Sequence, residues 1–212
     1  MGVEETKKSL SSKLFSFGML RAVFFAALLF FTSCSDSFTP PIELSYTLTR
    51  DLVQKGVPIH IEAKGHYQAA EDGRWANHAE ASLAMNGLEE AIHLKLLFIS
   101  NTHEEWLISE SSVLPGRQIY RFHAGTMHAL SHKDEVEGTH FFGPADFNPI
   151  EIWNASKGAK TRLASGGRIL TEEFLQLGLS QITLNPSFKE GAFQFIPAEN
   201  DEILDGAELL GF

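Results

Sequence analysis

The fold is decided by a stretch of strict alternation, Ile42-Glu43-Leu44-Ser45-Tyr46-Thr47-Leu48-Thr49. A period of two places Ile42, Leu44 and Tyr46 on one side of an extended chain and the polar residues on the other. Burial of a helix would instead require apolar residues three and four positions apart. The sequence therefore predicts a β-strand with one buried face at this point.

The same alternation recurs further along the chain, between turn signals such as Asn86-Gly87, where both residues tolerate a positive φ. Short strands at this spacing, with little helix between them, are typical of curved or closed antiparallel sheets. We therefore predict a mainly β fold: a strongly curved antiparallel sheet, or incomplete β-barrel, of about ten strands with a short helix and a loop lid. The other predicted strands are 59–64, 75–85, 92–98, 106–108, 118–122, 127–130, 150–153, 160–163, 182–184 and 192–196.

Two segments depart from the strand pattern. Residues 171–178 predict a short helix, because Thr171 can cap it, two glutamates favour its N-terminal end and Gly178 can close it. Residues 131–148 form the longest predicted loop. Loops of this length in compact domains are usually functional or disordered, so we expect this one to act as a lid. The hairpin at 149–163 is expected to lie beyond it.

The N-terminal segment carries a targeting signal. An apolar run at 22–31 follows a basic region that ends at Arg21. The run is shorter than the roughly 20 residues of a membrane-spanning helix and matches the core of a signal peptide. Phe31-Thr32-Ser33-Cys34 then resembles a lipobox. We predict that residues 1–33 are a lipoprotein signal peptide and that Cys34 is lipidated. An uncleaved membrane anchor is the alternative.

The residues after the cysteine suggest where the protein is held. Residues 34–41 contain Pro40-Pro41 and predict a lipidated tether. In lipoprotein sorting of the enterobacterial type, Asp after the cysteine means retention at the inner membrane, so Ser35 favours the outer membrane. We expect a lipid-anchored protein of the bacterial cell envelope, facing the periplasm. Residues 42–212 are then a single domain of ordinary size.

Charge excludes one class of partner. The chain has a formal charge of −10, and removing residues 1–33, which carry +2, leaves −12. An acidic domain is repelled by phosphate groups, so we exclude nucleic-acid binding. Cys34 is the single cysteine, so no internal disulfide is possible and the fold must depend on its apolar core.

The sequence contains no recognised catalytic motif. It lacks a glycine-rich phosphate loop, a Gly-x-Ser-x-Gly elbow and a His-Glu-x-x-His zinc pattern, so we predict no enzyme activity, no cofactor and no metal. His123, His128, His132 and His140 cluster in sequence, but strand and loop geometry separates their side chains. A hydrolase would need a polar cleft that brings His123 or His128 to Asp146.

The apolar residues on the predicted strands suggest a binding site. Each can be ordinary core, but on the concave side of a partly filled sheet such residues line a cavity for acyl chains. Sequence does not separate these two possibilities, because both require apolar residues at alternate positions. The predicted cavity residues are Trp75, Leu83, Leu94, Leu96, Phe98, Trp106, Tyr120, Phe122, Trp153, Phe193 and Phe195.

The last third of the chain resembles the LolA/LolB-like lipoprotein-sorting superfamily. The resemblance rests on Ile182-Thr183-Leu184-Asn185, on Phe193-Gln194-Phe195-Ile196-Pro197 and on the acidic tail that follows. Gly73-Arg74-Trp75 is faintly similar to an Arg-Trp pair on an early strand of that family. The resemblance implies an incomplete β-barrel with a helical lid and a hydrophobic cavity. The chain lacks the family's long amphipathic N-terminal helix, and its lipid anchor suggests the receptor rather than the soluble carrier.

These observations predict a membrane-anchored lipoprotein that binds acyl chains of lipoproteins or lipids for transport or sorting in the cell envelope. Its partners would be the membrane, through Cys34, and the acyl chains themselves. The alternative is a structural or assembly lipoprotein with a filled core that binds an envelope protein. An empty apolar interior would favour the first function and a filled interior the second.

Overall fold

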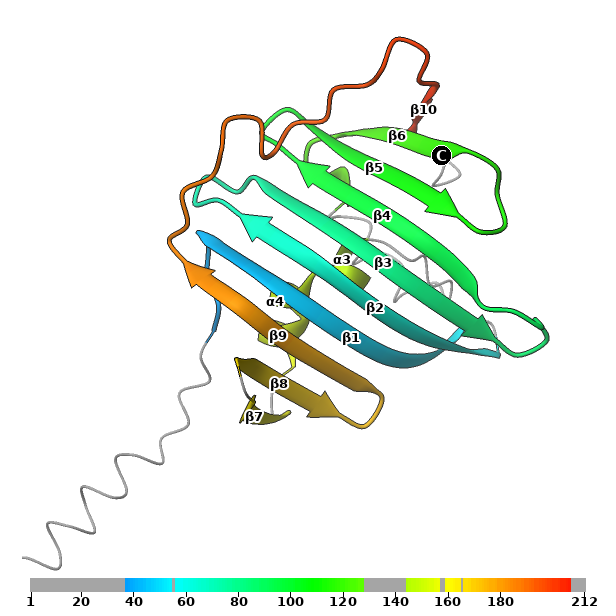
Figure 1. The fold of residues 1–212 in the computed structure, drawn as a ribbon, viewed down its shortest axis with the longest axis vertical. Helices are drawn as coiled ribbons and strands as arrows, with labels where there is room; N and C mark the ends of the chain where they lie inside the picture. The colour runs from blue at the N-terminus through cyan, green and yellow to red at the C-terminus, as the bar shows by residue number, and fades with distance from the viewer. Residues whose placement is uncertain (1–36, 55, 128–143, 157–158, 165, 207–212) are drawn as a thin grey trace, which may run out of the picture. The chain divides into compact units, whose positions relative to one another are not determined.

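The computed structural model describes residues 37–54, 56–127, 144–156, 159–164 and 166–206 (Figure 1). The chain divides into two units, Met1–Ser37 and Phe38–Phe212. The second unit is mainly β, with one open, curved sheet, as the sequence predicts. Its strands are β1 (Ile42–Gln54), β2 (Val57–Ala69), β3 (Trp75–Met85), β4 (Ile92–Ser100), β5 (Glu104–Ser111), β6 (Arg117–His123), β7 (Lys160–Ala164), β8 (Gly167–Glu172), β9 (Leu175–Leu184) and β10 (Ile203–Asp205).

The order of strands in the sheet is β10-β6-β5-β4-β3-β2-β1-β9-β8-β7. β1 to β6 follow one another as antiparallel neighbours, whereas β9 returns to pair with β1. Only the short β10, which pairs with β6, is parallel to its neighbour. The chain must therefore pass from β6 to β7 across the width of the sheet. The helices α3 (Pro144–Phe147) and α4 (Pro149–Ala155) lie on this crossing.

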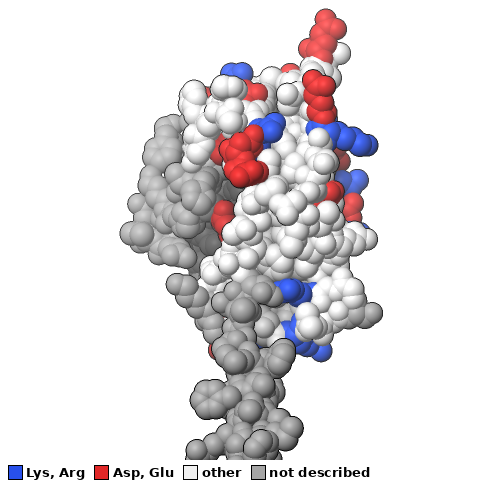
Figure 2. Space-filling view, turned by 90° about the vertical axis from the view of Figure 1, so that its left-hand side faces the viewer, with Lys and Arg blue, Asp and Glu red and all other residues white. Residues whose placement is uncertain are grey.

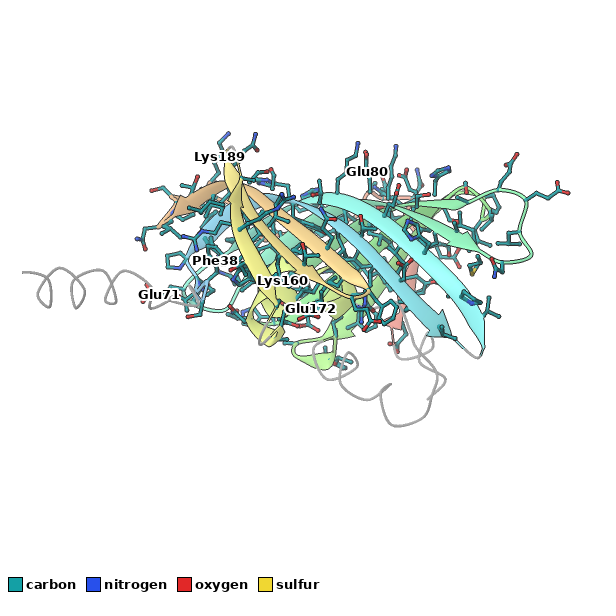
Figure 3. The ribbon with its side chains drawn as sticks, turned by 90° about the horizontal axis from the view of Figure 1, so that it is seen from below. Phe38, Glu71, Glu80, Lys160, Glu172 and Lys189 are labelled. Carbon is teal, nitrogen blue, oxygen red and sulfur yellow. The ribbon has the colours of Figure 1, made fainter. Side chains whose placement is uncertain are left out.

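The two faces of the sheet differ in what covers them. We call the concave face covered by α3 and α4 the inner face, and the opposite one the outer face. Figure 3 shows Glu80 on the outer side and Phe38 on the inner side. The larger core cluster lies on the inner face, where Tyr46, Phe98 and Leu177 are buried. A smaller cluster on the outer face includes Trp106 and Phe193.

Acidic and basic side chains are interspersed on the surface, as Figure 2 shows for one side of the molecule. Across the outer face, Lys64, Glu80, Lys95, Glu110 and Arg117 lie opposite one another on β2 to β6, so that the charge alternates from strand to strand. Lys64 donates to Glu80 at 2.9 Å and lowers the pKa of that carboxyl. Opposite charges directly across a strand pair favour this register.

The predicted helix at 171–178 is wrong. These residues form the end of β8, a turn at Glu173-Phe174 and the start of β9. Leu177 and Leu179 are buried on the inner face, and Leu170 of β8 faces Leu177. A period of two was therefore present in the sequence. Thr171 and Gly178, which resemble helix-capping residues, lie instead within β8 and β9.

The predicted strand at 150–153, and with it the hairpin at 149–163, is also wrong. These residues form α4, which begins after Asn148, whose Oδ1 accepts from the amides of Ile150 at 3.1 Å and Glu151 at 3.3 Å. Pro149 stands at the first helical position, where its missing N–H costs nothing. Asn-Pro was the signal that could have identified this helix. The strand β7 (Lys160–Ala164) exists, but its partner is β8.

The predicted strand at 192–196 is not formed, and the one at 127–130 is described only at its first residue. Residues 192–196 belong to an irregular segment that packs on the outer face, where Phe193 contacts Phe188 with ring centroids 5.0 Å apart. Met127 lies in a helical turn, and its amide donates to the Glu105 carboxylate at 2.7 Å. The rest of the predicted strand at 127–130 and most of the predicted lid lie outside the described residues. At the end of the lid, residues 144–147 are helical.

We predict that Gly65→Ala destabilises the fold, because Gly65 makes room for a neighbouring ring. A Cβ at this position would lie 2.5 Å from the Tyr46 ring and 2.6 Å from the carbonyl oxygen of His78. Both neighbours are part of the sheet and cannot withdraw freely. The free energy of unfolding, from urea denaturation, should fall by about 1–3 kcal/mol. Ala84→Ser adds one atom at an exposed position of β3, and an equal loss there would contradict the explanation.

Candidate functional site

The inner face has small side chains at its middle. Ala63, Gly65, Ala79 and Ala81 occupy the centre of β2 and β3, in two rows across the sheet. The next strand continues these rows with Leu94 and Leu96, both only partly buried. Because the side chains at the centre of β2 and β3 are short, they leave space above the concave side of the sheet for other apolar groups. We call this region of small side chains the apolar floor.

α3 is held over this face by a chain of hydrogen bonds. The Tyr46 hydroxyl donates to Asn77 Oδ1 at 3.1 Å, and Asn77 Nδ2 donates to the carbonyl oxygen of Phe147 at 2.7 Å. The Phe147 ring stacks on Phe98 with centroids 6.1 Å apart. Burial raises the pKa of Tyr46 far above its ordinary value, more than the Asn77 bond lowers it. The phenol is therefore a fixed neutral donor, and the Tyr46–Asn77 pair sets the position of α3.

An ion pair provides a second tie. Arg50 of β1 donates to Asp146 of α3 at 2.7 Å, and the two side chains are 33% and 8% exposed. Arg50 belongs to the inner row that continues through Ile61 and Leu83. A charge in such a row is costly unless it is paired. Asp146 therefore both neutralises Arg50 and ties α3 to the sheet.

α4 covers the part of the inner face that α3 leaves open. It also contacts Phe38, which lies four residues before the start of β1. Phe38 packs edge-on against Trp153, with centroids 5.4 Å apart, and the Arg168 guanidinium lies 5.3 Å from its ring centre. Asn154 bonds both the amide of Phe38, at 3.3 Å, and its carbonyl, at 3.1 Å. Phe38 is 7% exposed, so the last residues of the predicted tether are part of the folded unit.

The structure brings together most of the predicted cavity residues. Trp75, Leu83, Leu94, Leu96, Phe98, Tyr120, Phe122 and Trp153 belong to the inner cluster. Trp153 reaches it from α4 and not from a strand. Trp106, Phe193 and Phe195 belong instead to the outer cluster. The strand at Trp106-Leu107-Ile108 is apolar on both faces, so alternation could not assign its sides, and Leu107 is the residue that faces inward.

Several inner-face residues were missed by sequence reasoning. β8 and β9 contribute buried leucines because they are strands and not a helix, and α3 contributes Phe147. A period-two reading of 175–179 would have found Leu177 and Leu179. Nothing in the sequence around Phe147 indicates that it lies on Phe98, because that contact depends on the crossing of the chain over the sheet. The missed residues are Phe147, Ile150, Leu170, Leu177 and Leu179, whereas Ile42, Leu44, Tyr46 and Leu48 lie on the buried strand face that the alternation predicts.

Much of the inner face is packed by the protein itself. Phe147 is fully buried, and Ile150, Ile152 and Trp153 are at most 9% exposed. Open hollows that described residues line lie on the outer face, with volumes of about 710 and 610 Å³. Both run between charged rows that include Lys64, Glu80 and Lys95. An acyl chain on the inner face would therefore have to displace α3 or α4 from the apolar floor.

On the outer face, His66 lies between a serine and an acid: its Nδ1 is 3.5 Å from Ser45 Oγ and its Nε2 is 3.0 Å from Glu43. The Ser45 hydroxyl donates to Gln181 Oε1 at 2.8 Å, so its hydrogen points away from the histidine.

His123 is exposed on β6, whereas Asp146 is buried against Arg50. His128, His132 and His140 lie outside the described residues. Among the residues that are placed, no group of three or more His, Cys, Asp or Glu side chains could hold a metal ion.

Other predictions concern the ends of the chain. Cys34 lies outside the described residues, and so does the apolar run before it. Within the described ranges, no helix has the length and apolar character required to cross a bilayer. No protein-family model and no curated protein sequence matches this chain. The LolA/LolB-like resemblance remains a prediction from short motifs and strand pattern.

We predict that Arg50→Met loosens α3, because Asp146 loses the cation that compensates its burial. The free energy of unfolding should fall by about 1–3 kcal/mol, and amide exchange at 145–147 should accelerate. Adding Asp146→Asn should recover part of the loss, since an amide is less costly to bury than a carboxylate. Lys64→Met, which breaks an exposed pair, should leave exchange in α3 unchanged. Equal exchange in both single variants would contradict this assignment.

The pH dependence of His60 is a second prediction from these contacts. Its Nδ1 lies 2.6 Å from Asp51 and its Nε2 3.5 Å from Glu62. The hydrogen bond to Asp51 is the main reason why the pKa of His60 is raised above 6.5. Its contribution to stability is therefore complete below the unfolded-state pKa and lost as the pH rises through the folded-state value. NMR titration should show the raised pKa, and Asp51→Asn should return it towards 6.5.

Proposed function

We propose that this chain is a membrane-anchored lipoprotein of the cell envelope that binds an acyl chain on its inner face. The observation that carries the proposal is the small, apolar floor at Ala63, Ala79 and Ala81, next to the partly buried Leu94 and Leu96. The bound species would be a lipid or the lipid-modified end of a lipoprotein.

The cover over this floor is suited to movement. α3 and α4 are short, at 4 and 7 residues, and isolated helices of that length are not stable alone in water. The hydrogen bond from Asn77 and the ion pair with Arg50 tie α3 to the sheet at two points. Asn154 of α4 also bonds Phe38, and Tyr67 of β2 bonds Asn148.

An acyl chain could replace the apolar contacts of the two helices, but not these hydrogen bonds. Each buried methylene contributes about 0.8 kcal/mol to binding. Twelve methylenes of an acyl chain would therefore contribute about 10 kcal/mol, from which the entropy cost of ordering the chain is subtracted.

The anchor is the second part of the proposal. Lipid on Cys34 would hold the domain at the membrane, because two acyl chains give stable attachment. Phe38 is fixed to α4 by ring and hydrogen-bond contacts, so only four residues separate the predicted lipid from the folded unit. The domain would then act beside its membrane and not as a diffusing shuttle.

One observation favours a different function. Phe147, Ile150 and Trp153 already fill part of the inner face, which is the arrangement expected of a structural or assembly lipoprotein. In that case α3 and α4 would be permanent core, and the protein would act through a protein partner. The two functions differ in whether apolar ligands can enter.

We predict that the unit lacking residues 1–34 binds a fluorescent fatty acid and retains lipid in native mass spectrometry. Leu94→Gln places an amide on the apolar floor and should weaken binding at least fivefold. The matched control is His93→Gln, one residue away on the outer face, which should bind as the wild type does. Circular dichroism melting establishes that both variants are folded. Absence of binding by the wild-type unit in both assays would favour the filled-core function.

The anchor is tested in whole cells of a bacterium that processes lipoproteins. The full-length chain should incorporate labelled palmitate and fractionate with membranes. Cys34→Ser should abolish the label, because the thiol is the acceptor of the lipid. A variant that retains the label would contradict the assignment of Cys34.

A further inference from the structure

Six of the ten large apolar side chains that are most exposed among the described residues lie at one end of the sheet. The β1–β2, β3–β4, β5–β6 and β8–β9 turns all lie at the end where β1 finishes, on the right of Figure 1. We call this the apolar end. Each turn carries at least one large apolar residue that is more than a third exposed: Val53 68%, Val57 39%, Leu88 50%, Val113 62%, Leu114 57% and Phe174 60%.

At the opposite end, Leu163 beside the β7–β8 turn and Leu184 at the end of β9 are exposed, but the other two turns are polar. The β2–β3 turn contains Glu71 and Asp72, and the β4–β5 turn consists of polar residues from Asn101 to His103. Arg74 donates to Asp72 at 2.8 Å and holds the pKa of that carboxyl below its ordinary value. These two polar turns show that a hairpin of this sheet can form without exposed apolar residues in its turn. Single exposed apolar residues are normal in proteins, but their concentration at one end marks an interaction surface.

A hollow lies among three of these turns. Its volume is about 570 Å³, and its lining includes Val53, Pro58, Ala84, Met85 and Phe174. The backbone of β8–β9 is fixed to β1 there, because the amide of Asp51 donates to the carbonyl of Phe174 at 2.9 Å. Both Val53 and Phe174 are mostly exposed. The hollow is therefore a preformed apolar socket and not a gap left by a mobile turn.

The polar groups around the socket are mainly acidic. Asp51 lines it and pairs with His60, while Glu62 lies on the other side of that histidine. Exposed glutamates follow on the neighbouring turns, at 89–90 and 172–173. Among these described residues, the carboxylates outnumber the single basic group, His60, so anionic lipid would be repelled. A basic group next to an apolar side chain would be attracted.

We propose that the apolar end is a docking site for a partner protein that inserts one or two apolar side chains, flanked by lysine or arginine, into the socket. A preformed pocket that accepts a single anchor residue is typical of the energetic centre of a protein interface. A bilayer surface has no projecting group to fill it. The exposed residues on the other turns would form the surrounding contact.

The position of the site fits such a partner. β1 has 13 residues between the Phe38 end and the apolar end, which corresponds to about 40 Å at 3.3 Å per residue. Four residues of tether reach at most about 14 Å. The apolar end can therefore be presented to the periplasm while Cys34 stays in its membrane. This last step rests on the proposed anchor, whereas the socket and its charge do not.

The first test uses defined probes and the unit lacking residues 1–34. One fluorescein-labelled peptide carries phenylalanine and leucine between lysines, a second has glutamates in place of the lysines, and a third has serines in place of the apolar residues. Fluorescence anisotropy should show binding of the first peptide only, and weaker binding at higher salt. Phe174→Asp should weaken it at least tenfold. Leu184→Asp, which changes an apolar residue 62% exposed at the opposite end, should not.

The second test identifies the class of the natural occupant in cells. A photo-crosslinking amino acid is placed at position 174, or at position 184 as the matched control, in the full-length chain. Crosslinks to one protein from position 174 alone, abolished by Val53→Asp, support the proposal when that protein, purified, loses at least tenfold in affinity for the Phe174→Asp variant. Crosslinks to lipid, equal crosslinking from both positions, or none from position 174 would overturn it.

These outcomes are separate from those that test acyl binding. The socket is on the outer face and at the turns, so Phe174→Asp should leave fatty-acid binding unchanged. Leu94→Gln should likewise leave peptide binding unchanged. Loss of fatty-acid binding in the wild type would remove the proposed function and keep the docking site, and the reverse result would do the opposite.

Discussion

β1 is the strand on which both halves of the sheet depend. It pairs along its length with β2 on one side and with β9 on the other. Without it, the β2–β6 meander and the β7–β9 group would be separate small sheets, each with an open edge. Because both groups join at β1, the chain leaving β6 has to cross the inner face to reach β7. The crossing places α3 and α4 on the apolar side, so the connectivity itself creates the cover.

The side chains of the inner face fit α3 both in their size and in the polar groups that they present to it. Tyr46 lies where Gly65 has no side chain, and its hydroxyl bonds Asn77, which in turn bonds the α3 backbone. One buried network thus relates β1, β3 and α3. Buried polar groups are tolerated only when they are paired, so the network specifies one position for α3. Arg50 and Asp146 make a second polar contact at the preceding residue of the helix.

The outer face has a different character, and the two proposed activities are separated accordingly. Alternating charges on β2 to β6 fix the register and keep the middle of that face in water. The C-terminal segment covers part of that face through Phe193 and Phe195, and Arg117 at the start of β6 is bonded to Asp201 at 2.6 Å. The exposed apolar turns lie at the end of the sheet where β1 finishes. Apolar cargo on the inner face and a protein at the turns would therefore not compete for the same residues.

The sequence by itself determined the strands of the sheet where one face is buried and the other solvated. Ile42–Thr49, Trp75–Met85 and Ile92–Phe98 alternate cleanly, and they form β1, β3 and β4. The charges also follow from sequence. Alternation fails where both faces are covered, which is why Trp106 was assigned to the wrong side. At 175–179 the apolar residues do alternate, but the flanking residues also resemble helix caps and predict a helix.

Only the tertiary structure decided what occupies the inner face. Asn148 and Pro149 could have indicated α4, but its position beside Phe38 and Trp153 depends on the return of β9 to β1. The gathering of Val53, Leu88, Leu114 and Phe174 at one end likewise depends on strand direction, since these residues are far apart in sequence. Local patterns specify which side of a strand is apolar. Which strands become neighbours, and hence what the apolar side contacts, is fixed by long-range pairing.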